Sequence, residues 1–264
     1  MRFGCGLASV APGPPLARTE CETPCVDTSP DAVWRHRLKI LAEQWDLPAS
    51  APGRLGVLLE RLAADERAPT TVRDPEDAVD QHVADSLVAL ELPQIRSAES
   101  LADLGAGAGF PSLVLAAARP DARVVAVESV GKKATYIAET AQAMGLTNLE
   151  VLPLRAEEWT PAMGEVDVVT ARALAPLVVL EEYAAPLLRL GGTLVAWKGK
   201  RDPEEERAGL AAAELLGLEP DEVRSVTPFA GARDRYLHLY SKVSPTPDRY
   251  PRRPGMARKR PLAS

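Results

Sequence analysis

The chain has 264 residues, of which 46% are hydrophobic and 26% are charged, and this composition is typical of a globular protein with one large domain or a medium domain plus a smaller attachment. It contains no apolar run of about 18 residues, so we expect neither a transmembrane helix nor a role at a membrane. The formal net charge of −6, taken alone, argues against a nucleic acid partner.

The first stretch of the chain, residues 1–30, is rich in Pro, Gly, Thr and Cys without periodicity, and we expect a disordered leader there. Prolines interrupt it, so it does not have the pattern of a signal peptide, and a cytoplasmic location is expected. The three cysteines all lie in this leader, and an odd number argues against a disulfide framework. Cys21 and Cys25 have no His or Cys following at ligand spacing, so we expect no metal site.

Residues 31–98 have the pattern of a small helical N-terminal region. Apolar residues recur there at three- and four-residue steps in three stretches, which predicts three amphipathic helices. The apolar positions are Trp34, Leu38, Leu41 and Trp45; then Leu55, Leu58, Leu59 and Leu62; then Val79, Val83, Leu87 and Leu90 within Asp77–Leu90.

From about residue 99 the spacing of apolar residues changes. Short apolar runs now alternate with segments of helical periodicity. The expected strands are Leu101–Leu104, Val124–Val127, Leu149–Leu152, Val166–Val169 and Thr193–Trp197. The expected helices between them are Ser112–Ala118, Lys132–Met144, Leu177–Leu188 and Glu204–Leu216. Such alternation indicates a parallel sheet with helices on both faces. Val223–Val226 and Tyr236–Val243 have no helix between them and predict an antiparallel hairpin at the sheet edge, so we expect a Rossmann-like α/β methyltransferase domain over residues 99–245.

The sharpest motif runs from Asp103 to Pro111, after a strand and before a helix. Glycines at 105, 107 and 109 allow a tight turn and a close approach to a ligand. Glu128 ends the next strand, where a carboxylate suits the hydroxyls of a ribose. Asp103 precedes the first glycine, and its negative charge is acceptable beside a cationic sulfonium but not beside a pyrophosphate. The charge of Asp103 and the spacing Gly-x-Gly-x-Gly, in place of Gly-x-Gly-x-x-Gly, favour S-adenosylmethionine over NAD or FAD. The expected ligand-binding residues are Gly105, Gly107, Asp103 and Glu128.

Two further segments follow strands on the same side of the predicted sheet. Backbone groups of Ala156 and Glu157 would lie beside the adenine, although the same residues could form an ordinary polar loop. Arg172 follows the fourth strand, where ligands of open α/β sheets sit. It cannot accept a proton, but it can hold a phosphate or a carboxylate, and the alternative is a surface ion pair.

The last predicted segment, residues 246–264, is a basic tail. From Arg249 to Ser264 there are six bases and no acid, which leaves 25 bases against 37 acids on the rest of the chain. A basic tail on an acidic body is consistent with binding of nucleic acid, and equally with a solubilising extension.

The residues also exclude some methyl-transfer chemistries. The segment from Thr170 to Pro176 has no Asn/Asp-Pro-Pro-aromatic signature of exocyclic amine methylation, and residues 31–264 contain no cysteine nucleophile for pyrimidine C5. The N7 lone pair of guanine needs no proton removed before attack, so a site without an evident general base suits it. It suits other nucleophiles of that kind as well.

With these motifs placed, the chain closely resembles the ribosomal RNA small subunit methyltransferase G family, also called glucose-inhibited division protein B. The resemblance runs from about residue 36 to the end. The matching segments are 82–87, 103–111, 127–129 with 131–133, 170–177, 191–192 with 198–199, and 250–255.

The resemblance implies methyl transfer from S-adenosylmethionine to guanine N7 in the helix-18 loop of 16S rRNA, on the small ribosomal subunit, by a protein expected to be monomeric. The family's binding positions fall on Gly105, Phe110, Ala156, Glu157 and Arg172. The chain departs from the family at residues 68–70, where Ala-Pro-Thr replaces the usual Asn-Leu-Thr. We expect His82 and Asp85, three residues apart, to dock the helical region onto the sheet.

Three other functions stay open at this point. The chain could be a methyltransferase of a small molecule or a protein, which would not need the basic tail. It could be a NAD-dependent oxidoreductase, for which no acid–base residue stands out. It could also be a ribosome-assembly factor that binds cofactor and RNA without turnover, because no catalytic group is identified; Arg172 is the best candidate for positioning the substrate.

Overall fold

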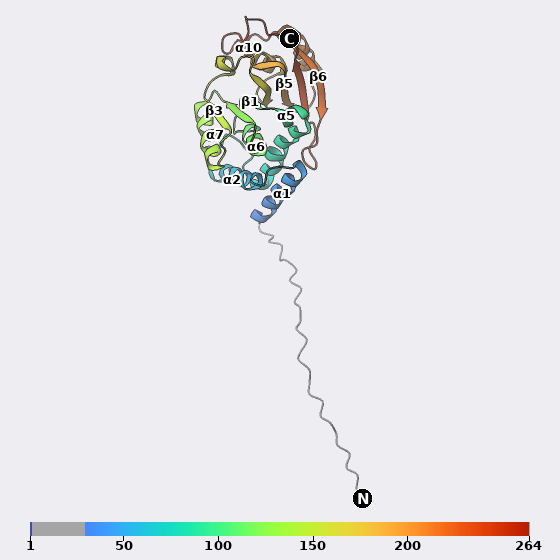
Figure 1. The fold of residues 1–264 in the computed structure, drawn as a ribbon. Helices are drawn as coiled ribbons and strands as arrows, with labels where there is room; N and C mark the ends of the chain where they lie inside the picture. Colours follow the sequence, from blue (N-terminus) through green and yellow to red (C-terminus); the bar gives the residue numbers. More distant parts are fainter. Residues whose placement is uncertain (2–29, 264) are drawn as a thin grey trace.

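The computed structural model describes Met1 and residues 30–263 (Figure 1). The expected leader, including its three cysteines, therefore lies outside the described residues apart from Met1 and Pro30. Figure 1 shows α1 and α2 at one end of the molecule and the C-terminus at the other, with the sheet between them.

Seven strands form one sheet in the order β3-β2-β1-β4-β5-β7-β6. Strands β1 to β5 run parallel, and β7 lies antiparallel between β5 and β6, which confirms the predicted parallel sheet with an antiparallel hairpin at its edge. The strands are β1 (Ser100–Leu104), β2 (Arg123–Val127), β3 (Leu149–Leu152), β4 (Val166–Arg172), β5 (Leu188–Lys198), β6 (Leu218–Ser225) and β7 (Tyr236–Lys242).

The strand sequences explain why both faces of the sheet are covered. In β2, Val124 and Ala126 belong to one buried cluster and Val125 and Val127 to the other, as expected for a strand that is apolar on both sides. Helices α6 (Ser112–Ala118) and α7 (Gly131–Ala143) pack in the first cluster, together with the N-terminal helices. Helices α8 (Leu177–Ala184) and α9 (Pro203–Leu216) pack in the second.

The N-terminal region contains the three predicted helical stretches. Helices α1 (Pro30–Trp45) and α2 (Ala51–Ala64) are regular, and the leucines predicted for the apolar face of α2 are buried. The third stretch is composite: α3 (Pro75–Ala78), the π-helical η1 (Val79–Ala84), α4 (Asp85–Leu87) and the 3-10 helix η2 (Val88–Glu91), followed by α5 (Pro93–Ser97). Among the described residues, no helix has the length and apolar character needed to cross a membrane.

Three predicted boundaries differ from the observed ones by four or five residues, for local reasons. Helix α8 ends at Ala184 and not at Leu188, because Pro186 has no N–H to donate to a helical hydrogen bond. Leu188 instead begins β5, five residues before the predicted start. Strand β6 also begins earlier than predicted, at Leu218, because it is an edge strand whose exposed acidic residues give no apolar signal.

The C-terminal segment folds back onto the body. Arg252 pairs with Glu182 of α8, whose side chain is 1% exposed. The short helix α10 (Met256–Lys259) buries Ala257 in the same cluster as α8 and α9. The two short helices η3 (Ala156–Glu158) and η4 (Thr160–Ala162) complete the elements of the described part of the chain.

Candidate functional site

The sheet changes direction beside β1, because β2 and β3 lie on one side of it and β4 and β5 on the other. The loops that follow β1 and β4 therefore run in opposite directions from the carboxyl ends of these strands. Open α/β sheets bind ligands in the crevice between such loops. The glycine loop, residues 105–111, occupies this position. A Cβ on Gly105 would lie 2.4 Å from Cδ1 of Leu174, whereas one on Gly107 would meet nothing nearer than 3.7 Å. Gly105 is thus required by packing, and Gly107 leaves open space above its backbone.

Glu128 ties the loops after β1 and β2 together. Its Oε2 accepts the backbone N–H of Gly107 at 3.0 Å, and its Oε1 accepts that of Val130 at 2.8 Å. The side chain is buried, yet a carboxylate has about four lone-pair positions, so it can still accept hydroxyl groups from a ligand. We call residues 105–109 of the glycine loop and Glu128 the cradle.

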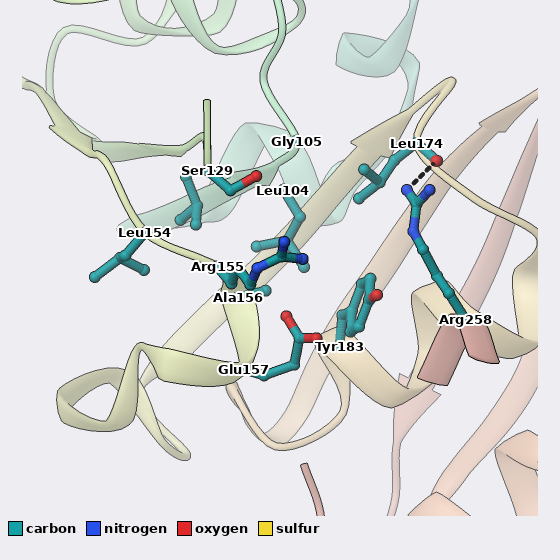
Figure 2. Close-up of a pocket in the computed structure, with 11 residues that line it drawn as sticks. Leu104, Gly105, Ser129, Leu154, Arg155, Ala156, Glu157, Leu174, Tyr183 and Arg258 are labelled. Carbon is teal, nitrogen blue, oxygen red and sulfur yellow. Dashed lines mark hydrogen bonds between the residues drawn. The ribbon is translucent and has the colours of Figure 1, made fainter. Parts of the chain in front are cut away.

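Two neighbouring cavities open over the cradle. The first, of about 390 Å³, is drawn in Figure 2, where Leu154 and Ser129 lie on the side opposite Arg258. Its lining includes the predicted residues Gly105, Ala156 and Glu157. The second, of about 440 Å³, includes the predicted residues Gly105, Gly107, Phe110, Glu128 and Arg172. Seven of the eight predicted cofactor residues therefore line one or the other of these two cavities, which share Gly105, Ser129, Leu174 and Arg258.

Asp103 is the predicted residue that lines neither cavity. Its carboxylate accepts the backbone N–H of Ser112 at 3.1 Å and the hydroxyl of Thr170 at 3.2 Å. Burial raises the pKa of Asp103 to about 6, although the hydrogen bonds from Ser112 and Thr170 act to lower it. Asp103 thus connects β1, β4 and the start of α6 behind the cradle, and its direct contact with a cofactor stays a prediction.

Arg172 stands at the wall of the second cavity and is held by the helical region. Its Nη1 lies 3.2 Å from Oδ2 of Asp85, and its Nη2 donates to the carbonyl of Gln81 at 2.9 Å. Asp85 also pairs with Arg235 at 3.4 Å and accepts the indole N–H of Trp197 at its backbone carbonyl. The alternative prediction of an ion pair is therefore realised, but the pair is largely buried and not on the open surface.

His82 completes this arrangement. Its ring stacks on Phe110 with centroids 4.3 Å apart. Its Nε2 lies 3.0 Å from the Thr70 hydroxyl and 3.3 Å from the carbonyl of Val72; since a carbonyl only accepts, we assign the proton to Nε2. Nδ1 is then free to accept from Arg172 at 3.3 Å.

Burial and the charge of Arg172 lower the pKa of His82 to about 4. The ring is therefore neutral at physiological pH, in agreement with the tautomer assigned above. His82 and Asp85 do dock the helical region onto the sheet, as predicted. We call His82, Asp85, Phe110, Arg172 and Arg235 the junction.

Some lining residues were not predicted. Tyr183 and Arg258 reach the first cavity from α8 and α10, and Pro69, from the segment that departs from the family, lines the second. Lys198 pairs with Glu205 and lines a third cavity beside the junction. In the described residues, no group of three or more His, Cys, Asp or Glu side chains is arranged to hold a metal ion.

The residues fit S-adenosylmethionine. The open space above Gly107, the buried carboxylate between two loops and a mixture of acids and bases in the lining suit a nucleoside joined to a zwitterionic amino acid and a sulfonium. The sheet order and this site together define a class I S-adenosylmethionine-dependent methyltransferase.

Comparison with known proteins identifies the family. Residues 62–233 match the family model described as rRNA small subunit methyltransferase G (GidB). The ribosomal RNA small subunit methyltransferase G of Deinococcus deserti is 41% identical over 196 residues, which cover 73% of this chain and 80% of that protein. The protein of the same name from Rubrobacter xylanophilus is 40% identical, with 72% and 75% covered.

The chain belongs to the rRNA small subunit methyltransferase G family, and its cofactor is S-adenosylmethionine. The family resemblance noted in the sequence is confirmed. Among solved structures, Aeropyrum pernix fibrillarin with bound S-adenosyl-L-methionine superposes with a TM-score of 0.49 and 18% identity, covering 60% of this chain and 72% of that chain.

Proposed function

We propose that this protein transfers the methyl group of S-adenosylmethionine to N7 of a guanine in the helix-18 loop of 16S rRNA. The relatives are named as ribosomal RNA small subunit methyltransferases, which supports the substrate class. The target atom rests on the family resemblance and on the chemistry of the lining residues. We further propose that the protein acts in the cytoplasm as a monomer, on the small ribosomal subunit and without a metal.

The observation that carries the proposal is that the cradle and the junction line one cavity. Gly105, Gly107 and Glu128 of the cradle line it together with His82, Phe110 and Arg172 of the junction. Glu128 would hold the ribose hydroxyls, and Ala156 and Glu157 would border the adenine. When bound, S-adenosylmethionine supplies an electrophilic methyl group. The second cavity would place the target base against that group.

The junction residues that line the second cavity, His82, Phe110 and Arg172, supply no free proton acceptor for the reaction, and Asp85 does not line it. The Nδ1 lone pair of His82 already accepts from Arg172, and Arg172 itself stays protonated. Guanine N7 needs no such group, because its lone pair would accept the methyl group from the bound sulfonium without loss of a proton. Alignment of the reacting atoms and exclusion of water then account for the acceleration.

Recognition of RNA would rely on basic side chains around the mouth of the cavity. Lys133 and Arg172 line the second cavity, and Lys198 and Arg235 line the third. They would contact phosphates and the unstacked guanine. We keep the division into a helical region (31–98), a methyltransferase domain (99–245) and a basic tail (246–264) as part of the proposal.

The test is transfer of labelled methyl from S-adenosylmethionine to small ribosomal subunits that lack the modification, followed by hydrolysis of the rRNA to nucleosides. The proposal expects the label in 7-methylguanosine. Label in another nucleoside would refute the target atom. Binding of cofactor without any transfer to rRNA would favour a small-molecule or protein substrate, or an assembly factor.

A further inference from the structure

The C-terminal segment lies outside the residues that match the family model, yet it is tied to the cofactor cavity. We call residues 249–263 the strap. Arg252 anchors it: Nε and Nη2 donate to the two carboxylate oxygens of Glu182 at 2.8 and 2.5 Å. Nη2 also donates to the carbonyl of Arg260 at 2.8 Å, which folds the strap onto itself. A buried carboxylate held at both oxygens fixes the strap on α8.

From this anchor the strap reaches the loop proposed to border the adenine. The backbone N–H of Gly255 donates to Oε1 of Glu157 at 2.9 Å. Gly255 has a φ of 82°, a conformation that glycine adopts without strain, and α10 begins immediately after it. The strap thus fixes the carboxylate of a residue that lines the first cavity.

Arg258 makes the second connection. Its Nη2 donates to the carbonyl of Leu174 at 2.7 Å, and Figure 2 shows the side chain extending from α10 to that carbonyl. The side chain of Leu174 packs directly on Gly105 of the cradle. The preceding residue, Ala173, has a φ of 52°, which is unfavourable for a residue with a Cβ and needs support from its surroundings.

We propose that the strap fixes one side of the first cavity, which Arg258 lines, and that Arg258 is a positioning residue for the cofactor, acting through Leu174. This inference rests on the proposed cofactor site and adds a role that the basic composition of the tail does not predict. To attract RNA, the tail would need only exposed Lys and Arg side chains. The strap instead directs Gly255 and Arg258 at Glu157 and Leu174, which both line the first cavity.

The test compares two basic residues on the same short helix, α10, in the full-length protein. Arg258→Ala and Lys259→Ala each remove one positive charge, and both side chains are exposed. The dissociation constant of S-adenosylhomocysteine is measured by titration calorimetry for both variants, for Arg258→Lys and for the unsubstituted protein. Thermal unfolding of each variant shows whether it is folded at the temperature of the titration.

Loss of the hydrogen bond to Leu174 should weaken binding about tenfold in Arg258→Ala, the usual size for a charge-assisted hydrogen bond. Lys259→Ala should stay within about twofold, and Arg258→Lys, which keeps a donor, should recover most of the affinity. Unchanged affinity in Arg258→Ala, or an equal loss in both alanine variants, would overturn the inference. If the unsubstituted protein failed to bind S-adenosylhomocysteine, the proposed cofactor site itself would fall with it.

Discussion

The cradle and the junction face the same cavity, but they are built over very different distances along the chain. In the cradle, Glu128 reaches Gly107 across 21 residues, and both follow neighbouring parallel strands. In the junction, Arg172 reaches Gln81 across 91 residues and joins the helical region to the sheet. The cradle is therefore a property of one strand–helix–strand unit, whereas the junction exists only when the N-terminal helices are docked. Variants should separate their roles.

The largest effect is expected from breaking the junction at Asp85. Asp85→Asn leaves the charges of Arg172 and Arg235 without their carboxylate, and removal of one partner from a buried ion pair costs about 3 kcal/mol. Urea denaturation would measure the loss. The control is Asp80→Asn on the same composite helix, whose pair with Arg37 is about one third exposed and should contribute less than about 1 kcal/mol. Equal losses of unfolding free energy in the two variants would show that the ion pairs of Asp85 stabilise the protein no more than an exposed pair does.

The second effect concerns Arg172 and sharpens the division of labour. Arg172→Ala should lower kcat/KM for small subunits about 100-fold, or about 2.7 kcal/mol, while the dissociation constant of S-adenosylhomocysteine changes less than about threefold. The two measurements are made at a temperature at which the variant is folded. A collapse of cofactor affinity would place Arg172 in the cofactor site and refute its proposed RNA role.

The third effect tests the cradle. Glu128→Gln replaces one of two acceptor oxygens by an NH₂ group that would face the N–H of Gly107 or Val130. Affinity for S-adenosylhomocysteine should fall about 30-fold, or about 2 kcal/mol. Glu150→Gln, which removes a carboxylate from the exposed pair with Arg123, is the matched control and should bind normally. Normal binding by Glu128→Gln would mean that the cofactor lies elsewhere.

The smallest effect is a pH dependence at His82. Its pKa is lowered to about 4 in the folded protein, so the unfolded chain binds more protons as pH falls below the ordinary value of 6.5. His82 therefore contributes stability that is fully present above about pH 6.5 and is lost as pH falls towards 4. The raised pKa of Asp103 has the opposite sign, since protonation of that buried acid favours the folded state as pH falls through about 6.

The His82 contribution is isolated as the difference in unfolding free energy between the unsubstituted protein and His82→Asn, because Asp103 is common to both. We expect that difference to shrink by about 1–2 kcal/mol between pH 7 and pH 5. A difference that stays constant over this range would show that His82 is not held neutral by the junction.

The separation along the chain between contacting residues also explains which features the sequence could predict. Helix Ser112–Ala118 and strand Leu149–Leu152 were predicted with their observed ends, and the cradle followed from local spacing of Gly105, Gly107 and Glu128. The π-helical turn that presents His82 has no local signal, because it depends on contacts with Phe110 and Arg172. The position of Arg258 depends on a contact across 84 residues, so composition indicated only that the tail is basic.

The most direct test of the central claim is to locate the methyl group in the RNA. Unmodified small subunits are methylated in vitro by the full-length protein, and the 16S rRNA is cut into defined fragments whose masses are measured before and after the reaction. The account predicts the mass of one methyl group on a guanine of the fragment that carries the helix-18 loop. A methyl group confined to another fragment, or to a ribosomal protein, would contradict it.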